Sequence, residues 1–168
     1  MANNFCTELG IPEYLHKDNR QDQQIFSIDE GLYRRFPKIQ NGKLSISDKG
    51  DIDQSIFSTD NMSCNRQDFC LTPEDVLFSS TSNTHYFHYG IVRISIKEIE
   101  NIVIQNTSIP ANKYELKVVH DPEECMYPHT VVKIFENGVL MEKPPGPSIK
   151  ISIRKKYAQI CTLIKAPQ

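Results

Sequence analysis

The residues best suited to chemistry are three arginines, one serine and one late histidine. Arg34 and Arg35 lie in a β-prone run, Ser63 lies in a second one that Arg66 follows, and His129 opens a third. Arginine can bind a pyrophosphate through two parallel hydrogen bonds. A histidine on a rigid strand can act as a general base near neutral pH, although such a histidine is more often structural. The five residues are therefore candidates for a catalytic site, provided that the fold brings them together.

ADP-ribosyl transfer is one reaction that these residues could perform. The segments Leu32-Tyr33-Arg34-Arg35 and Met62-Ser63 loosely resemble the first two elements of ADP-ribosyltransferase folds, in which an arginine clamps a pyrophosphate. Such sites also need a late glutamate that orients a ribose hydroxyl or deprotonates the acceptor. Glu98 and Glu136 are available, but neither lies in a Q/E-x-E motif. The missing glutamate motif is the weakest part of this hypothesis.

Cysteines and histidines supply weak candidates for a metal site. The pairs Cys64-x5-Cys70 and His85-x2-His88 offer four ligands, the number that zinc requires. Structural zinc sites usually place cysteines two to four residues apart and histidines three to five apart, so the spacing fits poorly. We therefore favour two semi-buried cysteines and a packed cluster of histidines and aromatic rings. The sequence predicts no metal and no cofactor.

Other functional signatures do not occur in the sequence. It contains neither a G-x-S-x-G nucleophile elbow nor a glycine-rich phosphate loop, which excludes nucleotide hydrolysis by a P-loop. A net charge of −2 and the lack of a helix-turn-helix or ribonucleoprotein motif count against nucleic-acid binding. Two local basic groups still leave nucleic acid open as a partner. They comprise Arg34, Arg35, Lys38 and Arg66, and Arg154, Lys155, Lys156 and Lys165.

Composition indicates one globular domain in a reducing compartment. Of the 168 residues, 39% are hydrophobic and 24% are charged, which suffices for a single core. No run approaches the roughly 18 apolar residues of a membrane span, and the start lacks the blocks of a signal peptide. Five scattered cysteines, an odd number, argue against a disulfide framework and for free thiols. We expect a cytoplasmic protein without a membrane partner.

The elements that must position the candidate residues are mostly short strands. Strand-like segments occur at 32–36, 62–65, 90–96 and 114–120, and Asn137-Gly138 predicts a hairpin between 130–135 and 139–141. Thr72-Pro73-Glu74-Asp75 predicts a short helix. Residues 148–158 fit either a strand or a helix, and 160–164 a last strand. We predict an α+β domain over residues 29–168, with a mostly antiparallel sheet and one or two short helices, after a polar arm over residues 1–28.

The chain also resembles a group of small bacterial proteins. The group combines an LYRR-(I/F)-P opening, a D-x-x-(L/M)-S-x-N-R box and a late P-H-T/A-H box. Here these correspond to residues 32–37, 60–66 and 128–130, and the resemblance covers about residues 30–167. It implies a bacterial cytosolic protein but no activity. The chain departs from the pattern at Cys64, where an aliphatic residue is expected, which weakens any required role for that thiol.

Two hypotheses about function follow. The first is an accessory or interaction protein of a bacterial cytosolic system, such as a toxin–antitoxin or defence system. It would act through a protein partner, because short strands can leave sheet edges open for pairing. The alternative is an ADP-ribosyltransferase-like or nucleic-acid-processing toxin or effector. It requires one cleft to contain Arg34, Ser63, Arg66 and His129.

Overall fold

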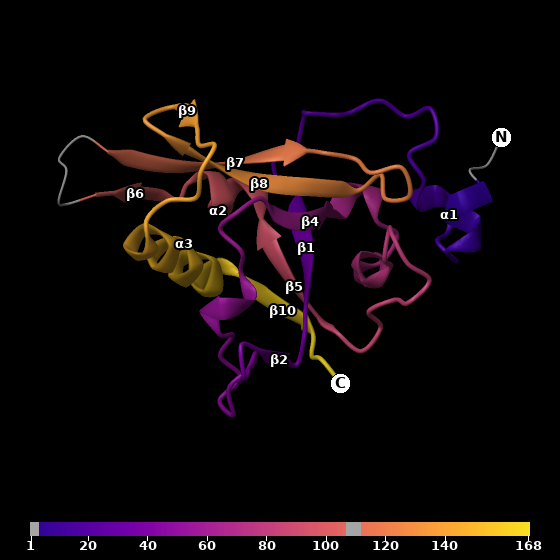
Figure 1. Cartoon of the computed structure of the whole chain (residues 1–168), viewed down its shortest axis with the longest axis horizontal. Coiled ribbons are helices and arrows are strands. Elements are labelled where there is room, and N and C mark those ends of the chain that lie inside the picture. The colour runs from indigo at the N-terminus through magenta and orange to yellow at the C-terminus, as the bar shows by residue number, and fades with distance from the viewer. Residues whose placement is uncertain (1–3, 107–111) are drawn as a thin grey trace.

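The computed structural model describes residues 4–106 and 112–168, and its central element is an antiparallel β-sheet (Figure 1). The strand order is β10-β5-β1-β4-β8-β7-β6, with β9 paired to β8, and all of these pairs are antiparallel. A separate two-stranded ribbon joins β2 and β3. The α+β class with a mostly antiparallel sheet is confirmed. The strands are β1 (Gly31–Phe36), β2 (Ile39–Gln40), β3 (Lys43–Leu44), β4 (Met62–Arg66), β5 (Gly90–Ser95), β6 (Val103–Gln105), β7 (Lys113–His120), β8 (His129–Glu136), β9 (Val139–Leu140) and β10 (Thr162–Lys165).

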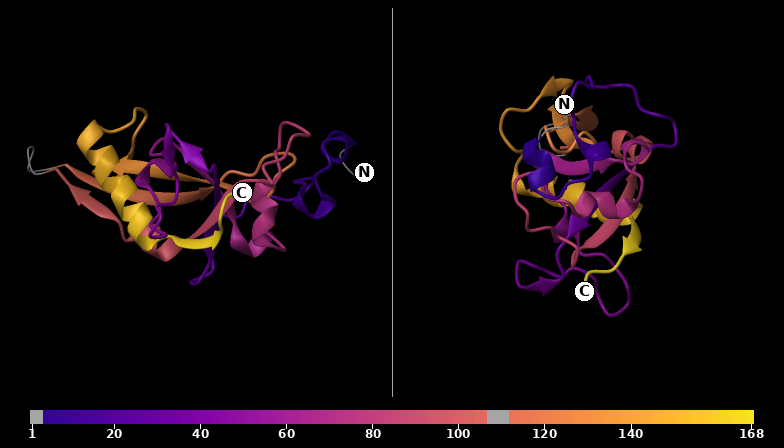
Figure 2. Two further views of the ribbon diagram at one scale, coloured as in Figure 1. Left: turned by 90° about the horizontal axis from the view of Figure 1, so that it is seen from below. Right: turned by 90° about the vertical axis from the view of Figure 1, so that its right-hand side faces the viewer.

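Helices are few in the described part of the chain. They are α1 (Asn4–Glu8), α2 (Ile96–Glu100) and α3 (Pro147–Ile160), with the short 3-10 helices η1 (Glu13–Leu15), η2 (Gln54–Ile56), η3 (Gln67–Phe69) and η4 (Pro73–Leu77). The ambiguous stretch 148–158 is therefore helical. Ile149, Ile153 and Tyr157 recur every four residues, so they form one buried stripe against the sheet. Helices α1 and α3 lie at opposite ends of the long axis of the molecule (Figure 2).

Local sequence signals for the turns hold in the structure. Asn137 and Gly138 have φ angles of 51° and 82°, the left-handed conformation that a tight hairpin between β8 and β9 requires. Thr72 and Asp75 form a capping box at the start of η4. The strand predicted at 90–96 differs in one respect. Ile91, expected opposite the buried face, is buried as well, because η4 covers that side of the sheet.

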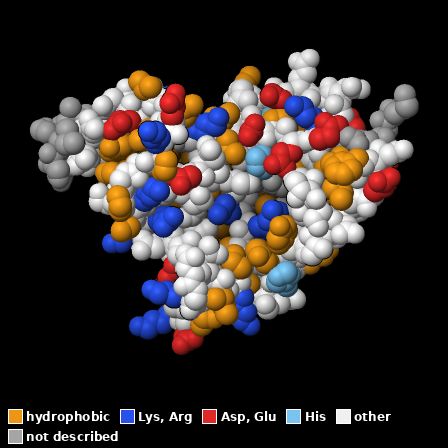
Figure 3. All heavy atoms as spheres, viewed as in Figure 1, with side chains coloured by type: hydrophobic (Ala, Val, Ile, Leu, Met, Phe, Trp, Pro, Cys, Tyr) orange, Lys and Arg blue, Asp and Glu red, His pale blue; other side chains and the backbone are white. Residues whose placement is uncertain are grey.

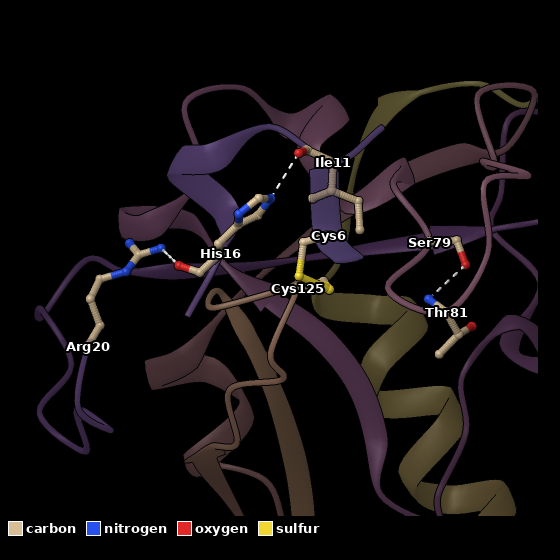
Figure 4. Close-up of a disulfide and its surroundings, with 7 residues drawn as sticks. All are labelled: Cys6, Ile11, His16, Arg20, Ser79, Thr81 and Cys125. Atoms are coloured by element: carbon tan, nitrogen blue, oxygen red, sulfur yellow. Dashed lines mark hydrogen bonds between the residues drawn. A yellow bond between two sulfur atoms is a disulfide. The ribbon is translucent and has the colours of Figure 1, made fainter. Parts of the chain in front are cut away.

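The segment before β1 packs against the loop that joins β7 to β8. Cys6, Ile11 and Leu15 form a buried cluster with Cys125 and Met126 of that loop. Cys6 and Cys125 are joined by a disulfide across a sequence separation of 119 residues (Figure 4). The expectation of free thiols is therefore wrong for this pair. Neither spacing nor neighbouring residues signal the bond, since only the docking of the arm brings the two cysteines together.

Hydrogen bonds hold the same segment along its length. The backbone N–H of Tyr127 donates to the carbonyl of Leu15 at 2.6 Å, and that of Lys17 donates to Glu124 at 2.8 Å. Further on, the N–H of Gln23 donates to Nδ1 of His120 at 2.9 Å. Burial lowers the pKa of His120, which favours the neutral ring that this bond requires. The arm therefore braces the β7–β8 loop.

Removing the disulfide should lower the free energy of unfolding by about 2–5 kcal/mol, because a bond that closes so long a loop restricts the unfolded chain. The comparison is urea unfolding of wild type and of the double variant Cys6→Ser/Cys125→Ser. A matched control is Cys161→Ser, which removes a free, half-buried thiol. Equal midpoints for wild type and the double variant would show that the two cysteines are not bonded.

Candidate functional site

The candidate site lies where the sheet divides between β1 and β4. These strands pair only at Leu32↔Arg66 and Tyr33↔Asn65. Beyond that point β1 continues along β5, whereas β4 continues along β8. A cavity of about 310 Å³ opens at this division, and four of the five predicted catalytic residues line it: Arg34, Arg35, Ser63 and His129. Figure 3 shows a hollow on this side of the molecule with basic side chains and a histidine beside it.

Ser63 and His129 contact each other directly. The Oγ atom of Ser63 is 2.9 Å from Nε2 of His129. The register explains the contact, because Ser63 pairs with Val131 and Asn65 pairs with His129. Ser63 and His129 are therefore diagonal neighbours on one face of two adjacent strands, within reach of each other's side chains. Ser63 is exposed at the cavity, and His129 is half-buried.

The hydrogen bonds of His129 determine which ring nitrogen carries the proton. Nδ1 lies 2.6 Å from the backbone carbonyl oxygen of Asp121. A carbonyl only accepts, so the neutral ring must carry its proton on Nδ1. Nε2 then has a free lone pair and accepts the hydrogen bond from the Ser63 hydroxyl. A hydroxyl paired with an oriented histidine is the arrangement of a nucleophile and its general base.

Glu123 completes this group from the β7–β8 loop. Its Oε1 atom is 3.7 Å from Nε2 of His129, and its side chain is 44% exposed at the rim of the cavity. Glu123 thus places a carboxylate beside the ring nitrogen that contacts Ser63. Neither of the glutamates considered from sequence, Glu98 and Glu136, lines the cavity. Glu123 carried no sequence signal beyond its place six residues before His129.

Arg34 spans the gap between the diverging strands. Its Nη1 donates to the carbonyl of Ser63 at 2.7 Å, while Nε and Nη2 donate to the carbonyl of Ile56 at 3.2 and 3.0 Å. The guanidinium thus satisfies backbone oxygens in the region where β1 and β4 no longer pair. Through the first of these bonds, Arg34 also fixes the backbone at Ser63.

Arg35 is held on the other side of the cavity. Both protons of its Nη1 are engaged, by the carbonyls of Val76 at 2.8 Å and Phe78 at 2.9 Å. Its guanidinium carbon lies 4.1 Å from the centre of the Tyr86 ring. Burial lowers the pKa of Arg35, and the charge of Arg34 lowers it further. Within the described residues, neither arginine forms an ion pair with a carboxylate.

Arg66 does not belong to the site, and its prediction as a cleft residue is wrong. It is buried and binds Glu30 through two bonds, Nε to Oε1 at 2.7 Å and Nη2 to Oε2 at 2.8 Å. The rings of Phe26 and Phe69 each lie 4.3 Å from its guanidinium carbon. The reason is the period of a strand, since a residue three positions after Ser63 must point to the opposite face.

The weak metal candidates are not brought together. Among the described residues, no three His, Cys, Asp or Glu side chains form a group that could hold a metal ion. Cys64 lies in the main core, where burial raises its pKa to about 11. Burial also raises the pKa of Cys70, so both thiols are poor nucleophiles. His85 accepts a hydrogen bond from the N–H of Ser79, and His88 packs on an aromatic ring.

The predicted basic groups differ in their setting. The first is not a continuous basic surface, because Arg66 is buried while Arg34 and Arg35 line the cavity. Arg154, Lys155 and Lys156 of the second lie on α3, and Lys165 is on β10. In the described ranges, no helix has the length and apolar character needed to cross a membrane.

No protein-family model, curated protein or solved structure matches the chain. We therefore infer function from the geometry of the cavity.

Removing the carboxylate of Glu30 should lower the free energy of unfolding by about 3–5 kcal/mol, because Glu30→Ala leaves the buried charge of Arg66 without its partner. Urea unfolding measures the difference. The control is Glu115→Ala, which breaks the exposed pair with Lys113 and should lower stability far less, because solvent screens an exposed ion pair. Similar losses in the two variants would mean that the Arg66–Glu30 pair is not buried in solution.

Proposed function

We propose that the protein is a hydrolase that cleaves an ester-type acyl bond, with Ser63 as the nucleophile and His129 as the general base. The observation that supports this most strongly is the 2.9 Å contact between Ser63 Oγ and His129 Nε2. The bond from His129 Nδ1 to the Asp121 carbonyl adds the third group that orients the base. Because Ser63 is exposed at the cavity, a substrate can reach the hydroxyl.

The reaction would proceed in two steps. In the first, His129 Nε2 takes the hydroxyl proton as Ser63 Oγ attacks the carbonyl carbon of the ester. The imidazolium then returns that proton to the leaving alcohol, which departs and leaves an acyl group on Ser63. In the second, His129 takes a proton from water, the resulting hydroxide attacks the acyl carbon, and the proton returns to Ser63 as the carboxylic acid leaves.

Charges around the cavity suit this reaction. The guanidinium groups of Arg34 and Arg35 line the same cavity as Ser63 and make its potential more positive, which favours the oxyanion of a tetrahedral intermediate. The carboxylate of Glu123 supplies negative charge beside the imidazolium. Charge stabilisation of this kind is usually the largest single contribution to catalysis. The two arginines and Glu123 need not move into the cavity to supply it, because they line the cavity already.

A toxin or effector that transfers ADP-ribose or processes nucleic acid would use the same cavity, but the residues there suit these reactions less well. ADP-ribosyl transfer needs a glutamate in a Q/E-x-E motif beside the bound ribose, and Glu123, the acidic residue on the cavity lining, does not lie in such a motif. Nucleic-acid processing needs basic groups on an open surface, whereas Arg66 is buried. The hydrogen-bonded pair of Ser63 and His129 is what acyl transfer requires. We therefore place acyl-bond hydrolysis first.

An accessory role through a protein partner is the second candidate. The observation that favours it is the edge strand β10, which exposes Leu163 and Ile164. An exposed, apolar edge strand is a template for pairing with a strand of another chain. This role, like the bacterial and cytoplasmic setting, remains a proposal. The buried disulfide weakens the expectation of a reducing compartment, because such bonds are rare in cytosolic proteins.

Hydrolysis of p-nitrophenyl acetate tests the proposal. Ser63→Ala should abolish turnover, and His129→Gln should lower kcat/KM by roughly 10²- to 10⁴-fold, because the hydroxyl loses its base. A fluorophosphonate probe should label wild type at Ser63 and neither variant at that position, as read by mass spectrometry. The control is Ser58→Ala, which removes a hydroxyl that donates to the Asp60 carbonyl outside the cavity.

Two results would contradict the proposal. One is wild-type protein that neither turns over esters nor reacts with the probe. The other is turnover that survives in folded Ser63→Ala. Capture of a stoichiometric protein partner that Ser63→Ala retains, with no esterase activity in wild type, would move the accessory role to first place.

A further inference from the structure

Arg35 has one hydrogen-bonding edge in use and one free. Its Nη1 donates to the carbonyls of Val76 and Phe78. In the described part of the chain, no protein group accepts a hydrogen bond from its Nε or Nη2. Neither atom is among the buried polar atoms that lack a partner, so both reach solvent. These two nitrogens form the edge with which a guanidinium grips a carboxylate or a phosphate in parallel bonds.

Arg66 of the same chain shows how the Nε and Nη2 edge of a guanidinium binds a carboxylate. Its Nε and Nη2 bind the two carboxylate oxygens of Glu30 at 2.7 and 2.8 Å. Arg35 presents the same pair of atoms, but no ion pair joins it to any acidic side chain within the described residues. Glu123 acts on Arg35 electrostatically but does not form an ion pair with it, so the free edge of this half-buried guanidinium is suited to an anion from solution.

The surroundings of Arg35 hold that edge in a fixed orientation. Val76 lies in η4, and Phe78 is the residue at its C-terminal cap. Two carbonyls therefore fix one end of the guanidinium, and the ring of Tyr86, 4.1 Å from the guanidinium carbon, covers one of its faces. A side chain fixed in this way loses little conformational entropy when it binds, so more of the interaction energy appears as affinity.

The balance of charge in the cavity also favours an anion. Arg34 and Arg35 both line it and raise its potential together. The acidic residue on the lining is Glu123, which is 44% exposed and lies beside His129. Burial lowers the pKa of Arg35 most and the charge of Arg34 lowers it further, whereas the carboxylate of Glu123 raises it, and a bound anion would act in the same direction as Glu123.

We propose that Arg35 forms the centre of an anion-binding subsite that takes a carboxylate or a phosphate group, in the cavity that contains Ser63. The cavity, at about 310 Å³, is of the size that holds a small molecule. The anion is then part of the substrate, which is a small ester with a negatively charged group. This last statement rests on the proposed function, whereas the subsite itself does not.

Binding of inorganic phosphate and of acetate to the full-length Ser63→Ala variant tests the subsite independently of the proposed nucleophile. Isothermal titration calorimetry should show binding that weakens as ionic strength rises. Arg35→Gln in the same background should weaken it by at least about tenfold, as expected for loss of a charge-assisted bidentate contact. The tighter of the two anions indicates which group the substrate carries.

The matched control is Arg93→Gln. Arg93 is another half-buried arginine of the sheet, and it donates to Gln67 Oε1 at 2.7 Å and to the Asp29 carbonyl at 2.9 Å. It does not line the cavity, so its substitution should leave anion affinity unchanged. Unchanged affinity in folded Arg35→Gln, or equal loss in the two variants, would overturn the subsite.

A second measurement needs no substitution at Arg35, in case that variant does not fold. Phenylglyoxal modifies arginines, and mass spectrometry maps the modified positions in wild type. Phosphate should slow modification of Arg35 by several-fold and leave Arg93 unaffected; no protection at Arg35 would overturn the subsite. Anion binding without ester hydrolysis would support the subsite and contradict only the proposed function. Ester hydrolysis without anion binding would support the proposed function and contradict only the subsite.

Discussion

β1 and β4 are neighbours for only two residue pairs, and the site depends on where their pairing stops. Each strand has a second partner along its other edge, β5 and β8 respectively, which holds it in place while the two separate. Arg34 of β1 bridges the gap to β4 through its bond to the Ser63 carbonyl, and it also binds the carbonyl of Ile56 in η2. The result is a hollow inside a sheet whose strands carry Ser63 and His129, the two side chains that we propose react. Positioning on strands is more exact than positioning on loops.

His129, the proposed base, is positioned by the β7–β8 loop and not by the gap between β1 and β4. His129 begins β8, and its orienting partner is the Asp121 carbonyl at the other end of the short β7–β8 loop. That loop also carries Cys125 and Met126, which pack with the N-terminal arm. Two backbone hydrogen bonds and a disulfide therefore connect the arm to the loop that sets the tautomer of His129. The arm, although remote in sequence from Ser63, is part of the support of the site.

Sequence patterns predict the local features of this fold and part of its site, namely Ser63 and His129. Alternation, turn residues and caps are local, so the strands, the Asn137-Gly138 hairpin and the capping box at Thr72 could be read directly. Residue type alone singles out Ser63 and His129. Their contact, however, depends on the β4–β8 register, which no local pattern specifies. The error at Arg66 was avoidable, since the period of two places it opposite Ser63. Glu123 and the Cys6–Cys125 bond depend on long-range packing and carried no signal in sequence spacing.

The proton on the His129 ring is the most direct test of the account, because the proposed catalysis requires Nε2 to be free. A long-range ¹H–¹⁵N spectrum of the histidine rings at pH 7.5, assigned with His129→Gln, reports the tautomer. We predict that His129 carries its proton on Nδ1. His120 should show the opposite tautomer in the same spectrum, because its Nδ1 accepts from Gln23 and its Nε2 lies 2.8 Å from the Tyr127 carbonyl. A proton on Nε2 of His129 would leave Ser63 without a base and contradict the account.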